Sequence, residues 1–336
     1  MKIIKRKIVI LLILSLAPLF WINNVYGESN NDTSNNRVEM SNAALKRLFE
    51  AGEPNRSQII DMLSKRDIDG LEKTYDNLFR QYKGDASYEV LLLDSYNLFS
   101  PANNISLADL DYWVSETGSY IAFAARGAYK NKLGFTARGT KFISETPKYR
   151  IDDMKELHRE AAKDLQLAIK KNPLLMPAYF NLISVAKASA MPFTPKEILD
   201  QAIKQDNRTY TVRLAYMHAI VPQWGGSYEE MSDFAKQTAQ YANVNPLLWT
   251  LQGVVFAEQG ADYWRESNFA KALDAYTSAL KFGDRTAWLV KRAACFWQIG
   301  KKDKAVEDYK KALYYNGNDT EAKNMLQSLQ TEMKRQ

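Results

Sequence analysis

The chain has 336 residues, of which 46% are hydrophobic and 25% are charged. This is the composition of an ordinary globular protein, and it excludes a collagen-like or globally disordered chain. One cysteine and two histidines are too few for a structural zinc site, which needs four nitrogen or sulfur ligands. We therefore expect neither a metal nor another cofactor.

The net charge of +6 comes mainly from the N-terminus. Lys2, Lys5, Arg6 and Lys7 are four of the 45 basic residues, and residues 1–27 contain no acid. Without these four, 41 basic residues remain against 39 acidic ones. The balance gives the rest of the chain no overall attraction to nucleic acid.

Residues 1–27 have the pattern of a secretory signal peptide. Residues 1–7 are basic, and residues 8–22 are largely apolar. The apolar stretch would span about 22 Å as a helix, less than the roughly 30 Å of a membrane core. Val25 and Gly27 stand at the −3 and −1 positions of a cleavage site. We expect export to the periplasm; the alternative is an uncleaved segment that anchors the chain in the inner membrane.

Residues 28–39 are rich in Asn, Ser and Asp. Such a segment has too few apolar side chains to pack, so we expect a disordered tether there.

From Met40 onward, apolar residues recur at spacings of three and four, and alternation of period two does not persist. Gly and Pro residues interrupt the pattern at short intervals. The sequence therefore predicts an all-α body of short helices joined mostly by short turns.

A long loop is expected at residues 131–149, between a helix that ends near Lys130 and one that begins near Ile151. Loops of this length inside a compact helical array are usually functional or disordered. This one carries Arg138 and Lys141.

A second candidate feature is the turn around Trp224. Pro222 ends a helix that begins near Thr209, and Gly225 and Gly226 permit a sharp reversal. Ser227 with Glu230 predicts a capping box at the start of the next helix. In the structural interpretation, Trp224 merely covers the turn; in the functional one, Trp224 and exposed backbone amides form a recognition corner.

Helical pairs recur toward the C-terminus. In residues 286–319, small and aromatic residues alternate at helix-crossing positions, and Gly300 allows a tight reversal. Residues 249–279 fit the same pattern with seven additional residues, 261–267, which predict an enlarged turn. Residues 320–333 predict a capping helix. Weaker matches lie upstream, at Ala161, Leu165, Ala168, Pro173, Tyr179, Leu182 and Ala202.

These offsets resemble the tetratricopeptide (TPR) repeat. The resemblance implies a right-handed α-solenoid that binds a protein or peptide, with the first helix of each pair on the concave face. It would place Phe180, Lys187 and Trp297 on that face. We divide the body into a degenerate repeat domain, 40–245, and TPR-like repeats with a capping helix, 246–336.

A second resemblance covers roughly residues 70–245. Residues 135–146 and 213–228 are similar to segments of the bacterial domain of unknown function 4034, a helical family that implies a fold and no established activity.

We expect the loop and the Trp224 turn to form a joint site, because both lie in turns within helical pairs. Arg126, Arg138 and Arg213 would supply its charge. The alternative is that these arginines pair with nearby acids and hold the loop in place.

Other motifs predict structural roles. Cys295 lies in an apolar helical stretch, so we expect a buried thiol. His158 and His218 lack the spacing of a zinc-binding helix and are expected to be packing or surface residues.

The sequence contains no nucleophile elbow or comparable catalytic motif. We therefore expect a binding scaffold in the bacterial cell envelope, with a protein, a peptide or a second copy of the chain as its partner. The competing class is an enzyme acting on an envelope polymer, with residues 131–149 as a lid over a carboxylate site.

Overall fold

The computed structural model describes residues 26–52, 54–141 and 143–335, and side chains from residue 34 onward. Most of the predicted signal peptide lies outside the described residues. Residues 37–336 form one compact unit, distinct from a first unit of residues 1–36.

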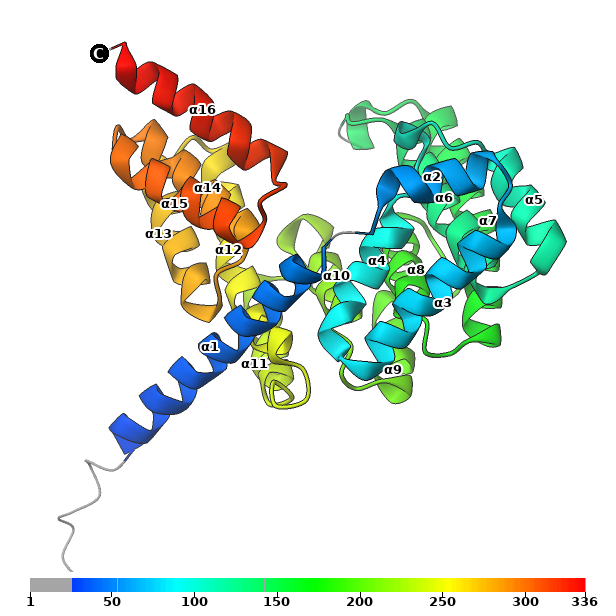
Figure 1. The fold of residues 1–336 in the computed structure, drawn as a ribbon, viewed down its shortest axis with the longest axis horizontal. Helices are drawn as coiled ribbons and strands as arrows, with labels where there is room; N and C mark the ends of the chain where they lie inside the picture. Colours follow the sequence, from blue (N-terminus) through cyan, green and yellow to red (C-terminus); the bar gives the residue numbers. More distant parts are fainter. Residues whose placement is uncertain (1–25, 53, 142, 336) are drawn as a thin grey trace, which may run out of the picture. The chain divides into compact units, whose positions relative to one another are not determined.

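The described part of the chain is all-α, as predicted, with no strand within it (Figure 1). The first eight α-helices are α1 (Tyr26–Ala51), α2 (Arg56–Ser64), α3 (Ile68–Gly84), α4 (Glu89–Asn97), α5 (Leu107–Thr117), α6 (Tyr120–Arg138), α7 (Lys148–Lys171) and α8 (Met176–Ala188). The next eight are α9 (Pro195–Gln205), α10 (Thr211–Ala219), α11 (Tyr228–Ala239), α12 (Leu251–Arg265), α13 (Phe269–Ala279), α14 (Thr286–Gln298), α15 (Lys302–Tyr315) and α16 (Thr320–Lys334). Short 3-10 helices occur in several connections, among them η4 (Pro222–Trp224) and η5 (Pro246–Thr250).

Four helical hairpins recur from α6 onward. Helices α6 and α7, α8 and α9, α12 and α13, and α14 and α15 pack as pairs, and neighbouring pairs stack on one another. Close crossing requires small residues: a Cβ on Gly253 of α12 would lie 2.5 Å from the Trp288 ring of α14. The predicted helical-repeat array is confirmed.

The last predicted repeat matches the structure closely. Helices α14 and α15 occupy the two predicted halves, and Gly300 between them has a φ of +79°. Ala293, Ala305 and Ala312 are fully buried where helices cross. Helix α16 follows at the predicted position.

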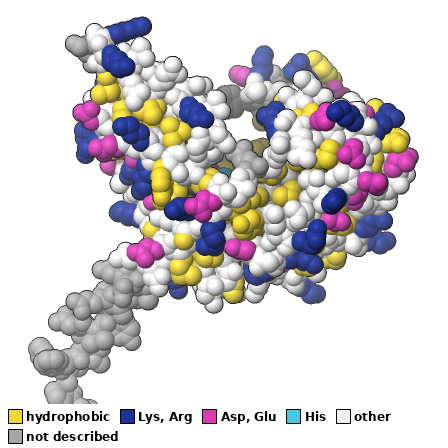
Figure 2. Space-filling view, in the orientation of Figure 1, with side chains coloured by type: hydrophobic (Ala, Val, Ile, Leu, Met, Phe, Trp, Pro, Cys, Tyr) yellow, Lys and Arg dark blue, Asp and Glu magenta, His cyan; other side chains and the backbone are white. Residues whose placement is uncertain are grey.

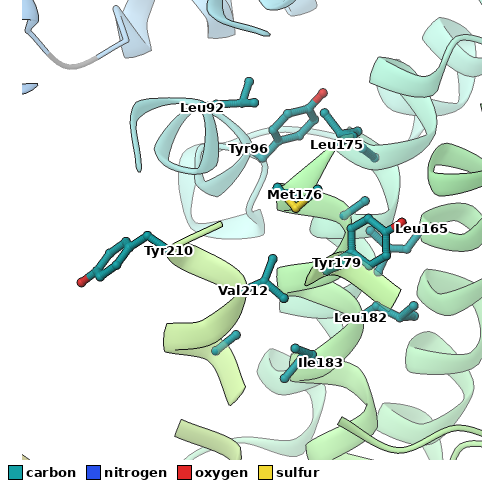
Figure 3. Packing of buried hydrophobic residues seen from close by; sticks show 14 of the residues in the cluster. Leu92, Tyr96, Leu165, Leu175, Met176, Tyr179, Leu182, Ile183, Tyr210 and Val212 are labelled. Atoms are coloured by element: carbon teal, nitrogen blue, oxygen red, sulfur yellow. The ribbon is translucent and has the colours of Figure 1, made fainter. Parts of the chain in front are cut away.

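One hydrophobic cluster extends through the chain from Ala44 to Trp288, and a second joins α14, α15 and α16. Figure 3 shows Tyr179, Leu182 and Ile183 of α8 packed near Leu165 of α7. Six of the seven upstream positions predicted from the repeat pattern are buried, and Pro173 in the turn before α8 is exposed; the buried positions are Ala161, Leu165, Ala168, Tyr179, Leu182 and Ala202. The core is continuous across residue 245, and the domain division there stays a prediction.

Cys295 is fully buried, as predicted, and burial raises the pKa of its thiol to about 12. On the outside, acidic and basic side chains are interspersed on the face that Figure 2 shows. No helix that the structure describes is both long enough and apolar enough to cross a lipid bilayer.

The expected loop at 131–149 is wrong in its extent, because α6 continues to Arg138 and leaves a connection of residues 139–147. Tertiary packing extends the helix. The Phe135 ring meets the His158 ring of α7 edge-on at 4.9 Å, and a Cβ on Gly134 would lie 2.5 Å from His158. Gly139, with a φ of +80°, then ends the helix.

Two other expectations are corrected. Residues 261–265 extend α12 instead of enlarging a turn, because Tyr263 and Trp264 pack against a small core around Tyr276. Residues 28–39 lie within α1 and are not an unstructured tether. In its compact part this helix is held at Ser41, whose hydroxyl donates to the Pro246 carbonyl (2.7 Å).

Candidate binding groove around Trp224

The backbone from Ile220 to Ser227, here called the Trp224 turn, presents Trp224 to solvent. Helix α10 ends at Ala219, and Pro222 begins η4. Gly225 has a φ of +91°. Gly226 has no room for a side chain, since a Cβ there would lie 2.0 Å from the Ile220 carbonyl oxygen. The result is an indole side chain on a residue that is 46% exposed, at the surface of a rigid turn.

Ser227 then starts α11. Its hydroxyl accepts a hydrogen bond from the Glu230 backbone N–H at 3.0 Å, which is one half of the predicted capping box. The complete reciprocal box occurs at Thr194 and Glu197, at the start of α9.

Trp224 borders a groove of about 320 Å³, called here the Trp224 groove. Three helices, α8, α10 and α12, contribute to its walls. Its lining residues are Phe180, Ser184, Lys187, Ala215, His218, Val221, Gln223, Trp224 and Glu258. Trp224 and Lys187 also border a second, open hollow of about 350 Å³ with Thr194, Tyr216 and Glu230.

The groove combines an aromatic surface with charges of both signs. The Lys187 ammonium lies 5.0 Å from the centre of the Trp224 ring, a cation–π distance. Burial lowers the pKa of Lys187, and the Glu258 carboxylate opposes that shift. His218 Nδ1 lies 3.2 Å from Glu258 Oε1. A ligand in the groove therefore meets an indole face, an ammonium and a carboxylate.

Three of the predicted binding residues come together here. Phe180 and Lys187 were expected on the concave face from their repeat positions, and Trp224 was expected from its turn. The structure brings all three to one groove.

Arg126 and Arg213 do not supply charge to this groove, which corrects the prediction. Arg126 donates to both oxygens of the buried Asp164 carboxylate (2.8 and 2.7 Å) and to Asp111 (2.9 Å). Arg213 is 1% exposed; its guanidinium donates to the Thr209 carbonyl. Arg126 therefore pairs with acids, as the alternative interpretation expected in kind, although with Asp164 and Asp111 and not with the acids near the loop. Arg213 bonds to a backbone carbonyl instead of an acid.

The joint site with the 131–149 segment is also wrong. Arg138 folds back on its own loop, where it donates to the carbonyls of Gly139 (3.4 Å) and Lys141 (3.2 Å). None of the described residues in 131–141 and 143–149 is among those that line the groove. Because α6 is longer than expected, the remaining connection is short, and its hydrogen bonds are local. It does not form the predicted joint site with the Trp224 turn.

Trp297 lies under the C-terminal helix, where its Nε1 donates to Glu332 Oε2 of α16 at 2.9 Å. It does not belong to the Trp224 groove. Ser184, His218 and Glu258 line the groove but were missed as binding residues. The only available signal was their place on first helices of pairs, which does not single them out.

His158 is a packing residue, as predicted. Its ring is fully buried, with Nδ1 2.7 Å from the Ser189 hydroxyl and Nε2 3.2 Å from the Asn131 carbonyl. Within the described residues, no group of histidine, cysteine and acidic side chains is arranged to hold a metal ion.

Comparison with solved structures finds TPR proteins. A TPR protein from Parabacteroides merdae is 13% identical, and the match covers 86% of this chain and 99% of that one, with a TM-score of 0.38. A thermophilic TPR protein from Thermus thermophilus is 16% identical, and the match covers 76% and 99%, with a TM-score of 0.30. The helices and their packing in pairs establish the all-α repeat fold without these comparisons.

No family model matches the chain, and no curated protein matches it. The resemblance of residues 70–245 to domain of unknown function 4034 therefore finds no support there.

Proposed function

We propose that this protein is an exported helical-repeat scaffold that binds a peptide segment of a partner protein in the Trp224 groove. One observation carries the proposal: three helices, α8, α10 and α12, and an exposed Trp converge on one groove. Stacked helical pairs offer an extended wall of this kind, and they function through its shape.

The chemistry of the groove suits a peptide. An aromatic side chain on a rigid turn gives contact area with little loss of conformational entropy, as in many protein interfaces. Lys187, Ser184 and the His218–Glu258 pair offer donors and acceptors around it. An extended segment or one helix of a partner would use both components.

Export is the second part of the proposal. It is supported by the basic, apolar and small-residue order of residues 1–27. The partner would then be another envelope protein, reached from the periplasm or from an N-terminal anchor.

The competing proposal, an enzyme acting on an envelope polymer, places its carboxylate at Glu258. Glycoside hydrolysis generally uses two carboxylates across the scissile bond. Glu258 is the one carboxylate that lines the described groove, and it faces His218. If the wild-type chain changed a peptidoglycan digest and the Glu258→Gln variant did not, the enzyme proposal would replace the scaffold.

The experiment is selection of a displayed library of random peptides on the wild-type protein, followed by rebinding to two variants. Trp224→Ala should weaken the selected peptides at least about tenfold, since central aromatic anchors contribute about 2 kcal/mol or more. Tyr149→Ala is the matched control, because Tyr149 is an exposed aromatic residue (63%) outside the groove. Equal binding by both variants, with unchanged melting temperatures, would contradict the proposal.

A further inference from the structure

A second cavity, of about 290 Å³, lies away from the Trp224 groove and is called here the Arg285 cavity. Helices α1 and α4 contribute most of its apolar wall, and the start of α14 and the end of α15 contribute polar groups. Its apolar lining includes Leu45, Leu48, Phe49, Val90, Leu91 and Leu247. A cavity with an apolar body and a few polar groups is the usual form of a small-molecule site.

Arg285 is the distinctive group. Its guanidinium carbon lies 5.6 Å from the Tyr210 ring centre and 5.2 Å from the Trp288 ring centre. These two aromatic contacts hold the guanidinium in place. Among the described residues, no acid lies within salt-bridge distance of Arg285, unlike Arg126, Arg208 and Arg292 in the same array. A held, half-buried arginine without an acid is suited to receive a carboxylate through two parallel N–H groups.

Other polar groups of the cavity are engaged elsewhere or are neutral. Tyr315 donates to Asp284 at 3.0 Å, and Asn316 and Asn318 are uncharged. Asp94 also lines the cavity; its charge acts on Lys132, whose ammonium donates to the Asn97 carbonyl. The negative charge of Asp94 would repel an anion in the cavity, so removing that charge should strengthen the binding of a carboxylate.

We propose that the Arg285 cavity binds a small carboxylate with an apolar body, with the carboxylate on Arg285 and the apolar part against Leu48 and Leu91. An acyl chain and the apolar C-terminal residue of a peptide share this chemistry. The site is independent of the peptide groove proposed above.

The test uses calorimetric titration of the full chain with octanoate, octanol, octylamine and N-acetyl-leucine. We expect octanoate or N-acetyl-leucine to bind at least about tenfold more tightly than octanol, and octylamine more weakly still. Preference for octanoate identifies an acyl chain as the source of the carboxylate, and preference for N-acetyl-leucine identifies a peptide C-terminus.

Three variants sharpen the result. Arg285→Gln should abolish the preference for the carboxylate over octanol, while Asp94→Asn should strengthen carboxylate binding. Trp224→Ala should leave it unchanged, so a failure here is distinct from a failure of the peptide groove. The proposal is overturned if neither carboxylate saturates a site, if octylamine binds as tightly as octanoate, or if Arg285→Gln, with helicity intact by circular dichroism, binds octanoate as the wild type does.

Discussion

The Glu89 carboxylate on α4 accepts hydrogen bonds from both the backbone N–H and the hydroxyl of Thr211, 122 residues further along the chain. It also accepts from the Thr209 hydroxyl (2.6 Å) and the Tyr210 N–H (2.7 Å). Glu89 is fully buried. This one carboxylate therefore fixes the start of α10, the central helix of the three that line the Trp224 groove.

Replacing Glu89 by Ala should lower the free energy of unfolding by about 3 kcal/mol or more, because several buried donors lose their acceptor. Urea denaturation measures the loss. Glu229→Ala is the control, since Glu229 is exposed on α11, and it should change stability by less than about 0.5 kcal/mol. Similar midpoints for the two variants would mean that the carboxylate does not hold α10.

The same site predicts a coupling between Glu89 and the buried Arg213. Burial lowers the pKa of Arg213, and the charge of Glu89 opposes that shift. Removing one charge leaves the other buried without compensation, so Glu89→Gln combined with Arg213→Met should cost less than the two single changes added together. A double-mutant cycle gives the interaction energy, and simple additivity would contradict the coupling.

Burial lowers the pKa of His158 to about 4, against 6.5 for a free histidine. The unfolded chain therefore binds a proton between these values that the folded chain does not. Stability is complete above about pH 6.5 and falls as the pH drops toward 4, by at most about 3 kcal/mol. Denaturation midpoints across this range measure the loss. His158→Gln should reduce the dependence, and a dependence that is unchanged in this variant would refute the assignment.

Gly226→Ala tests the Trp224 turn. The added methyl would meet the Ile220 carbonyl, so the turn must rearrange and the protein should lose roughly 2–4 kcal/mol of stability together with peptide binding. Gly84→Ala is the matched control because a Cβ there has open space around it. Thermal unfolding that is equally unaffected in both variants would show that the turn is not as tight as described.

Ala312→Glu tests the repeat packing. Ala312 is fully buried on α15, so a carboxylate there should cost several kcal/mol. Lys310→Glu introduces the same side chain at an exposed position two residues earlier and should have little effect. A melting temperature for Ala312→Glu close to that of the control would mean that this face of α15 does not pack as described.

The fold was largely predictable because local sequence determines it. Ala293, Gly300 and Ala312 stand at fixed offsets in a helical hairpin, and those offsets are visible without tertiary information. The end of α6 was not predictable, because Gly134 and Phe135 remain helical only through their contact with His158 on another helix.

The site was predictable in part. Trp224 could be inferred from turn chemistry, and Phe180 and Lys187 from repeat positions. His218 and Glu258 face one another from α10 and α12, and that pairing depends on how the two helices stack. Arg213 was misjudged for the same reason, since its side chain is buried by the packing of α10 and donates to the Thr209 carbonyl.

The most direct test of the groove is photo-crosslinking in intact cells, with a photoreactive amino acid in place of Ser184 inside the groove or of Leu167 on the exposed side of α7. The account predicts a discrete protein adduct from position 184, none from position 167, and loss of the adduct when Trp224→Ala is added. An adduct that forms equally from both positions, or that survives Trp224→Ala, would contradict it.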